Sequence, residues 1–186
     1  MANTPSNMLA LGTVAADFAL PNPSKENKIE TLNALKGEKA TLVMFICNHC
    51  PFVLHVIEKL AELYDDYKSQ GIEFIAISSN DAIAYPADGP ELMVDFAEEH
   101  GVNFPYLYDE SQEVAKAYEA ACTPDFFLFD KDLKLVYRGQ MDDSRPGNQK
   151  EITGEDLIIA FENLLADQPQ EELQKPSMGC NIKWKA

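Results

Sequence analysis

The chain has 186 residues, 46% of them hydrophobic, and its formal net charge is −16. This length and composition predict one globular domain over residues 1–186, with a sizeable core and short extensions. The acidic excess repels phosphate backbones and anionic lipid surfaces, so we expect neither nucleic acid nor membrane partners.

The first ten residues lack both a basic region and a continuous apolar core, so no signal peptide is predicted. No later stretch approaches the roughly 20 apolar residues of a membrane span. We therefore expect a cytoplasmic protein, or one from which a signal has been removed. In a reducing cytosol, the four cysteines indicate catalysis or metal binding rather than structural disulfides.

The first predicted elements form a small N-terminal β-hairpin, with an extended stretch at 12–20, a polar loop, and a second extended stretch at 29–32. A short helical turn at 33–37 follows. The apolar run at 41–47 contains β-branched and aromatic residues and no charge, which is typical of a strand buried on both faces.

Pro51 suits the first turn of a helix, because its missing N–H has no intrahelical partner there. Apolar side chains then recur at three- and four-residue steps up to Tyr67, which predicts an amphipathic helix ended by Gly71. Residues 72–78 are predicted to form a second buried strand. Strand, helix and strand of this length predict a right-handed parallel unit.

Shorter elements are predicted in the second half of the chain. We expect a loop at 80–90, a helix at 91–99 and an extended piece at 104–108. A helix at 111–120, a β-hairpin at 125–138 and a last helix at 153–165 are expected to follow. Ser111 and Thr153 are expected to start their helices. The tail from Asp167 is polar but ends with Ile182 and Trp184, so we expect it to dock back onto the fold.

Cys47 and Cys50 stand three positions apart where the buried strand gives way to the helix. Unpaired N–H groups and the positive end of the helix dipole stabilise a thiolate there, lowering its pKa from about 8.5. We expect Cys47, first and nearest the exposed turn, to be the more reactive sulfur and Cys50 to close a disulfide with it. An imidazolium at His49 would favour the Cys47 thiolate and a more oxidising couple; alternatively, His49 is an exposed turn residue.

These elements resemble the thioredoxin superfamily over about residues 10–166, leaving 167–186 as a C-terminal extension. Within it, the chain resembles the peroxiredoxin-like branch. The stretches that carry this likeness are Phe45-Ile46-Cys47-Asn48-His49-Cys50-Pro51-Phe52, Ser78-Ser79-Asn80-Asp81, Asp88-Gly89-Pro90-Glu91, Cys122-Thr123-Pro124-Asp125-Phe126-Phe127, Asp142-Asp143-Ser144-Arg145-Pro146 and residues 176–185.

The resemblance implies an α/β thioredoxin-like fold, with a central mixed β-sheet flanked by helices, an N-terminal β-hairpin and a docking C-terminal tail. It also implies a cis peptide bond before Pro124. The backbone of Thr123 would then lie across from the cysteines and pair with an incoming peptide.

The chain departs from its relatives in two ways. Peroxiredoxins that reduce peroxides carry Pro-X-X-X-Thr-X-X-Cys, but counting back from Cys50 puts Cys47 and Val43 at the threonine and proline positions. Counting from Cys47 gives Met44 and Ala40, so neither register fits. Thioredoxins also bury an acid beneath the second cysteine, where this strand offers only Thr41 and Val43, and proton handling at Cys50 has no predicted agent.

Two further cysteines and an arginine are candidate site residues. Cys122 would lie near the dithiol, either as a third, resolving thiol or as a small packed hydrophobe. Cys180 lies in the tail, and the resemblance of that tail to the peroxiredoxin-like branch implies a specific role for it, which the sequence does not identify. Arg145 would contact anionic substrate groups or pair with Asp142 or Asp143 in its turn, whose aspartates are also weak candidates for a hard cation.

We interpret the chain as a thiol–disulfide oxidoreductase whose Cys47 thiolate attacks a substrate disulfide, or whose own disulfide is attacked by a substrate thiol. Cys50 resolves the mixed disulfide, Thr123 and Pro124 position the partner, and Pro51 starts the helix that stabilises the thiolate. Expected partners are protein or small-molecule thiols and disulfides and a separate reductant; no cofactor is implied.

Three alternatives remain. The first is a peroxiredoxin-like antioxidant. The second is a zinc or copper(I) protein using Cys47, His49, Cys50 and Cys122 as soft ligands, although no second ligand pair stands at metal spacing. The third is a redox sensor or interaction module that no reductase recycles.

Overall fold

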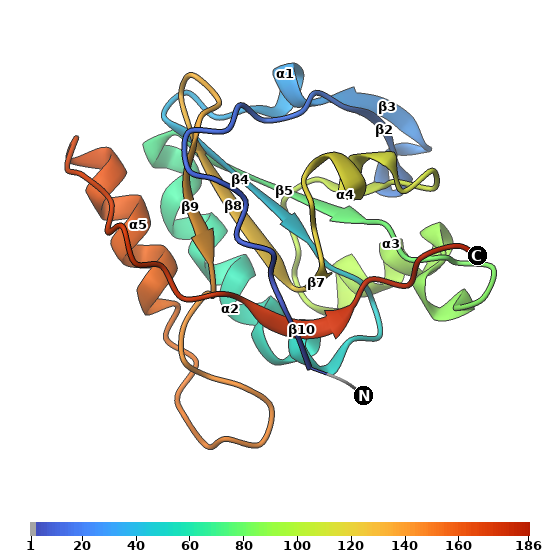
Figure 1. Cartoon of the computed structure of the whole chain (residues 1–186). Coiled ribbons are helices and arrows are strands. Elements are labelled where there is room, and N and C mark those ends of the chain that lie inside the picture. The colour runs from blue at the N-terminus through green and yellow to red at the C-terminus, as the bar shows by residue number, and fades with distance from the viewer. Residues whose placement is uncertain (1–2) are drawn as a thin grey trace.

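The computed structural model describes residues 3–186, and its centre is a five-stranded mixed sheet (Figure 1). In spatial order its strands are β6 (Tyr106–Tyr108), β5 (Ile72–Ser78), β4 (Ala40–Phe45), β8 (Asp125–Asp130) and β9 (Leu135–Gly139). Strand β4 runs parallel to β5 and antiparallel to β8, while β5 and β6 are parallel. Every residue of β4 is buried, as predicted for a strand covered on both faces.

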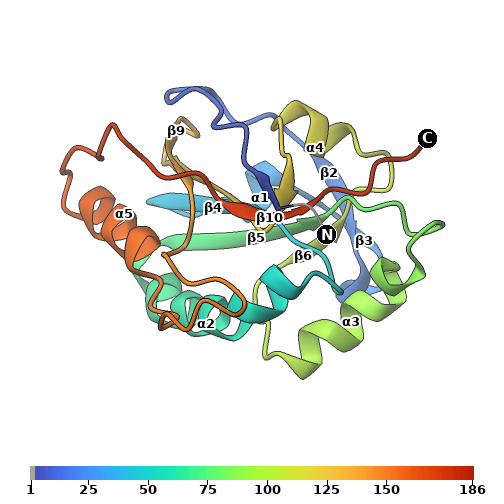
Figure 2. The same ribbon diagram turned by 60° about the horizontal axis from the view of Figure 1, so that its bottom comes forward.

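Helices cover both faces of the sheet. The face that carries Leu42 and Met44 packs against α2 (Pro51–Tyr67), α3 (Pro90–Glu99) and α5 (Glu155–Leu165), which lie together below the sheet in Figure 2. The opposite face carries Val43 and Phe45, which pack with the short helices α1 (Leu32–Leu35) and α4 (Glu113–Ala117). The alternation along β4 thus supplies both halves of the core. This is the predicted thioredoxin-like α/β architecture.

The predicted N-terminal hairpin is present as β2 (Ala19–Asn22) and β3 (Lys28–Thr31), which pair antiparallel. The described residues also form three single-turn 3-10 helices, η1 (Pro23–Lys25), η2 (Lys68–Gln70) and η3 (Pro86–Asp88). Helix α2 begins at Pro51, as expected, and Gly71 ends the turn that follows it in the left-handed region.

The C-terminal tail docks back, as predicted. Its strand β10 (Met178–Asn181) lies between β1 (Asn3–Pro5) and β7 (Cys122–Thr123), with both pairings antiparallel. In Figure 1 this strand runs below the lower ends of the sheet strands, next to α2. Beyond β10, Lys183 N–H donates to Asn80 Oδ1 at 2.8 Å. Both termini are therefore tied to the segments around the cysteines.

Two helix starts differ from the prediction. Helix α4 covers only Glu113–Ala117, because Gln112 takes a left-handed conformation with φ of 65° just before it. Gly154, rather than Thr153, is the N-cap of α5, and the carboxylate of Asp142 accepts hydrogen bonds from both N–H groups. The predicted side-chain cap is nevertheless formed, because Thr153 Oγ1 accepts a hydrogen bond from Glu155 N–H at 3.2 Å. A residue from a distant turn thus adds to the local cap that the sequence suggested. Among residues 3–186, no helix is long and apolar enough to cross a membrane.

Candidate active site

The two cysteines lie at the junction between β4 and α2. Cys50 is the N-cap residue of α2, and Cys47 precedes it in the turn that leaves the strand. Their residues are only 1% and 0% exposed, respectively. The expectation that Cys47 lies at an exposed turn is therefore wrong, because the Thr123–Pro124 segment and the 80–90 loop both contact this turn. No disulfide joins any of the four cysteines, all of which the structure describes.

The Thr123–Pro124 peptide bond is cis, as the resemblance implied. Cys47 Sγ lies 3.6 Å from Thr123 Oγ1, and the Cys50 thiol donates to Thr123 O at 3.2 Å. Residues about 75 positions apart are thus brought together, and this placement agrees with the predicted positions of Thr123 and Pro124 across from the dithiol. A pocket beside Pro124 is also lined by Phe52, Arg145 and Met178.

A buried carboxylate that the sequence did not predict anchors the turn between the cysteines. Asp88 is fully buried, and its Oδ1 accepts hydrogen bonds from Asn48 N–H at 2.9 Å and His49 N–H at 3.3 Å. Its Oδ2 accepts from Asn80 Nδ2 at 2.8 Å. Asp88 belongs to one of the stretches that carried the family likeness, and that was its only signal, since it ends the single-turn helix η3, which is too short to show a periodic pattern.

The imidazole of His49 is directed at this carboxylate. His49 Nδ1 lies 2.7 Å from Asp88 Oδ2, a close approach of the two atoms without an aligned hydrogen bond. The ring is also stacked on Tyr85, with centroids 6.0 Å apart and planes 2° from parallel. The partner that the structure gives His49 is therefore Asp88, and its predicted influence on the Cys47 thiolate stays a prediction.

The reduced dithiol behaves as an asymmetric pair. The hydrogen bond from Cys47, with further ones from Thr123 and Cys180, lowers the pKa of Cys50 to about 4 against the opposing effect of burial. The same Cys47–Cys50 hydrogen bond, burial and the nearby Asp88 carboxylate all raise the pKa of Cys47. The shared hydrogen bond therefore favours one thiolate and one thiol in the reduced pair. The Cys50 hydrogen bond, burial and the Asp88 carboxylate all disfavour a negative charge at Cys47, which the sequence predicted to be the more reactive sulfur.

Asp125 is a second buried acid that the sequence analysis missed. It is 0% exposed, and burial raises its pKa to about 7, despite hydrogen bonds from backbone N–H groups such as that of Ala121. Its other oxygen, Oδ1, is buried without an aligned hydrogen-bond partner. The carboxyl interacts with the thiol of Cys122. An acid next to the Thr123–Pro124 segment was hidden because a strand residue between apolar neighbours gives no sequence signal for a titrating group.

Cys122 and Cys180 flank the cis peptide bond from neighbouring strands. Cys122 is fully buried, its Sγ lies 3.5 Å from Pro124 O, and burial raises its pKa. Cys180 is 4% exposed and lies opposite Thr123 across β10 and β7. Burial and the interaction with Cys50 raise its pKa. The structure thus places both predicted extra thiols near the dithiol.

Arg145 contacts neither aspartate side chain of its turn. Its guanidinium donates to the backbone carbonyls of Asp142 and Ser144 and to the side chain of Gln140. The carboxylate of Asp143 pairs with Lys150 and Lys175 instead. The predicted surface pair is therefore not formed, and Arg145 reaches the dithiol region only as part of the lining of the pocket beside Pro124.

One group of side chains has the spacing of metal ligands. The ligand atoms of Cys47, His49 and Asp88 all lie within 4.8 Å of one another. This set shares two residues with the predicted soft-ligand set and replaces the other two with a carboxylate, which zinc accepts alongside sulfur and imidazole. Three ligands on one side would leave a coordination position open.

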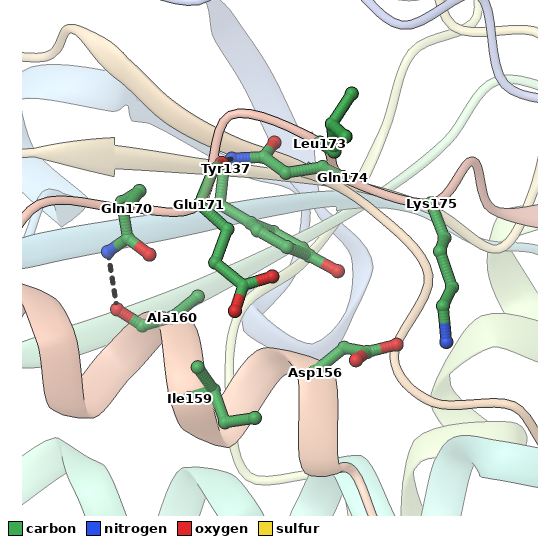
Figure 3. Close-up of a pocket in the computed structure, with 9 residues that line it drawn as sticks. All are labelled: Tyr137, Asp156, Ile159, Ala160, Gln170, Glu171, Leu173, Gln174 and Lys175. Atoms are coloured by element: carbon green, nitrogen blue, oxygen red, sulfur yellow. Dashed lines mark hydrogen bonds between the residues drawn. The ribbon is translucent and has the colours of Figure 1, made fainter.

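A second pocket lies between α5 and the start of the tail and contains no cysteine (Figure 3). Tyr137 points into it from β9, and its hydroxyl donates to Gln140 O at 2.5 Å. Gln170 closes one end by donating to Ala160 O at 2.7 Å. These polar groups are occupied within the fold, so the chemistry-bearing site is the one around the dithiol.

The fold and the paired thiols define a thioredoxin-like thiol–disulfide oxidoreductase. The AhpC/TSA family model matches residues 11–138, and the chain belongs to this family. Among curated relatives, the thiol-disulfide oxidoreductase ResA of Geobacillus kaustophilus is 30% identical over 141 residues, which are 74% of this chain and 75% of the relative. The ResA of Halalkalibacterium halodurans is 31% identical over 126 residues, covering 67% and 65% of the two chains.

Solved structures share the fold of this chain. A conserved protein of Geobacillus kaustophilus is 56% identical, with a TM-score of 0.97 over 100% of this chain and 97% of that one. A protein of Sinorhizobium meliloti is 50% identical, with a TM-score of 0.95 over 98% and 99%. The thioredoxin domain of a thiol-disulfide oxidoreductase from Bacteroides vulgatus, 22% identical with a TM-score of 0.65 over 84% and 99%, shares the fold.

Proposed function

We propose that Cys47 and Cys50 are the redox couple of this oxidoreductase and exchange electrons with protein or small-molecule thiols and disulfides. The observation that carries the proposal is the contact of both sulfurs with Thr123, beside a cis proline. In this arrangement a partner's sulfur meets the dithiol beside Pro124, whereas the predicted backbone pairing with Thr123 is taken by the chain's own strand β10. The cell supplies electrons through a separate reductant, and we propose the cytoplasm as the compartment.

The reaction requires a proton to move within the pair. When Cys47 attacks a substrate disulfide, its proton passes to the Cys50 thiolate along the hydrogen bond that joins them. One Cys47–substrate bond forms, the substrate disulfide breaks, and the leaving thiolate is released. Cys50 then loses that proton and attacks Cys47, which forms the Cys47–Cys50 disulfide and frees the second substrate thiol.

Turnover of a small disulfide or insulin with an external dithiol reductant tests this proposal. The wild-type protein should turn over, Cys47→Ser should abolish turnover, and Cys50→Ser should trap a mixed disulfide on Cys47. A matched control is Asp132→Asn, an exposed substitution away from the cysteines that should leave turnover unchanged. Wild-type activity in Cys47→Ser would refute the mechanism.

Two alternatives have tests of their own. The antioxidant alternative predicts that hydrogen peroxide is consumed with the same reductant, although neither cysteine has proline and threonine at the peroxidase spacing. The metal alternative is favoured by the grouping of Cys47, His49 and Asp88 within 4.8 Å. It predicts stoichiometric zinc or copper after purification under reducing conditions, lost in His49→Ala.

A further inference from the structure

Cys180 is held against the active site by the close approach of two strands. It lies directly opposite Thr123 in the β10–β7 pair, and Thr123 O accepts the hydrogen bond from Cys50. The neighbouring Gly179 makes this approach possible, because a Cβ at that position would lie 2.0 Å from Thr123 O. The backbone of β10 is therefore fixed relative to the residue that contacts both catalytic thiols.

The side chain of Cys180 points into the same core as the dithiol. Cys47, Cys50 and Cys180 belong to one cluster of buried residues, and β10 packs against α2, whose N-cap is Cys50. The thiol of Cys180 interacts with that of Cys50, and burial together with this interaction raises the pKa of Cys180. Cys50 therefore has a cysteine neighbour on each side, Cys47 before it in the chain and Cys180 from the tail.

Cys122 does not share this position. Its Sγ is directed at Pro124 O, at 3.5 Å, and it interacts with the carboxyl of Asp125. It belongs to neither of the two hydrophobic clusters that form the core faces of the sheet. Of the two extra thiols, Cys180 is the one that shares the buried cluster of Cys47 and Cys50.

We propose that Cys180 is a third redox thiol that exchanges with the Cys47–Cys50 disulfide, an inference that rests on the function proposed above. Cys180 Sγ attacks Cys50 Sγ, so that the Cys50–Cys180 bond forms and the Cys47–Cys50 bond breaks. Cys47 leaves as the thiolate and takes the proton that Cys180 gives up. The number of disulfides is unchanged, so the step needs no external oxidant.

This exchange gives the oxidised protein two forms. In one, Cys47 is locked in the disulfide; in the other, Cys47 is a thiol facing Thr123 while the disulfide links the tail strand to the start of α2. The second form can take up a substrate sulfur at Cys47 without prior reduction of the protein. The C-terminal strand is thereby part of the redox machinery and not only a covering element.

Disulfide mapping in the Cys47→Ser variant tests the proposal. The reduced variant is mixed with oxidised glutathione, quenched by alkylation, digested and analysed by mass spectrometry. Cys50 should first take up glutathione, and Cys180 should then displace it. The expected product has lost two hydrogens and contains a Cys50–Cys180 peptide pair. The Cys47→Ser/Cys122→Ala variant should give the same product, whereas Cys47→Ser/Cys180→Ala should retain the glutathione adduct.

A persistent glutathione adduct at Cys50 in Cys47→Ser, or a Cys50–Cys122 pair, would overturn the proposal. The parent function is read separately, from formation of the Cys47–Cys50 disulfide in the Cys180→Ala variant. If that disulfide forms while Cys47→Ser yields no Cys50–Cys180 pair, the third thiol is refuted and the dithiol mechanism stands. If it does not form, the dithiol mechanism itself fails.

Discussion

Asp88 Oδ2 lies 2.7 Å from Nδ1 of His49, the residue between the two cysteines, and the same carboxylate holds the backbone of the turn. A buried anion therefore stands beside Cys47, where the sequence suggested only a helix dipole and an imidazole. The arrangement fixes the turn, and it also shifts the negative charge of the reduced pair toward Cys50. Four predictions follow from particular contacts of this kind.

Asp88→Asn should lower the free energy of unfolding by about 1–3 kcal/mol. In the wild-type protein Asn80 Nδ2 donates a hydrogen bond to Asp88 Oδ2, and an amide NH₂ group at that position would be a second donor facing the first. The substitution should also make the couple more oxidising, since removal of the negative charge stabilises the thiolate form. Urea denaturation and redox equilibration measure the two effects. The exposed Asp66→Asn is the control, and unchanged stability and potential in Asp88→Asn would contradict the role of this carboxylate.

The reduced protein should carry a thiolate at neutral pH. The pKa of Cys50 is lowered to about 4, so the ultraviolet absorbance of the thiolate should be present above that pH and disappear as the pH falls through it. Cys50→Ser should lack this transition. If the thiolate absorbance of the wild-type protein first appears near the ordinary cysteine pKa of about 8.5, the pair does not hold a thiolate at neutral pH.

Asp125 should make stability fall as the pH rises. Folding raises the pKa of this carboxyl from 3.8 to about 7, so between these values the unfolded state binds fewer protons than the native state. The contribution of the protonated Asp125 to the free energy of unfolding is therefore fully present below about pH 4 and decreases as the pH rises to about 7. Asp125→Asn should gain about 2 kcal/mol relative to the wild-type protein between about pH 5 and pH 8. If the free energies of unfolding of the variant and the wild-type protein change in parallel with pH, this prediction is contradicted.

Gly179→Ala should destabilise the protein by about 1–3 kcal/mol, because the new Cβ meets backbone atoms of Thr123 that cannot move independently of β7. Gly89→Ala is a matched control, since Gly89 has an ordinary φ of −65° and its new Cβ would meet only Pro86 O, at 3.2 Å. Thermal denaturation compares the two. Equal stability of both variants would show that β10 is not packed tightly on the Thr123 segment.

The elements that carry strong periodicity were predictable from the sequence. The run 41–47 and the stripe from Val53 to Tyr67 placed the buried strand, the long helix and the cysteines between them. Family likeness supplied the facing Thr123–Pro124 segment and its cis bond. Local pattern and likeness together were enough to locate the dithiol and its principal neighbour.

Long-range contacts of single residues were not predictable. Asp88 acts from the single-turn helix η3, 40 positions from Asn48, and nothing in its local sequence says which backbone groups it will meet. The position of Cys180 depends on a strand that crosses from the far end of the chain. The burial of Cys47 and the rise of its pKa follow from such contacts, which no local pattern in the sequence indicates.

The most direct test of the central claim is the reduction potential of the Cys47–Cys50 pair, measured by equilibration in thiol–disulfide buffers with alkylation and peptide mapping. The account predicts a two-electron transition in which a Cys47–Cys50 peptide pair appears. A midpoint near −270 mV would mean a reductant, and one near −120 mV an oxidant. Failure of Cys47 to enter any disulfide, even in the most oxidising buffer, would contradict the account.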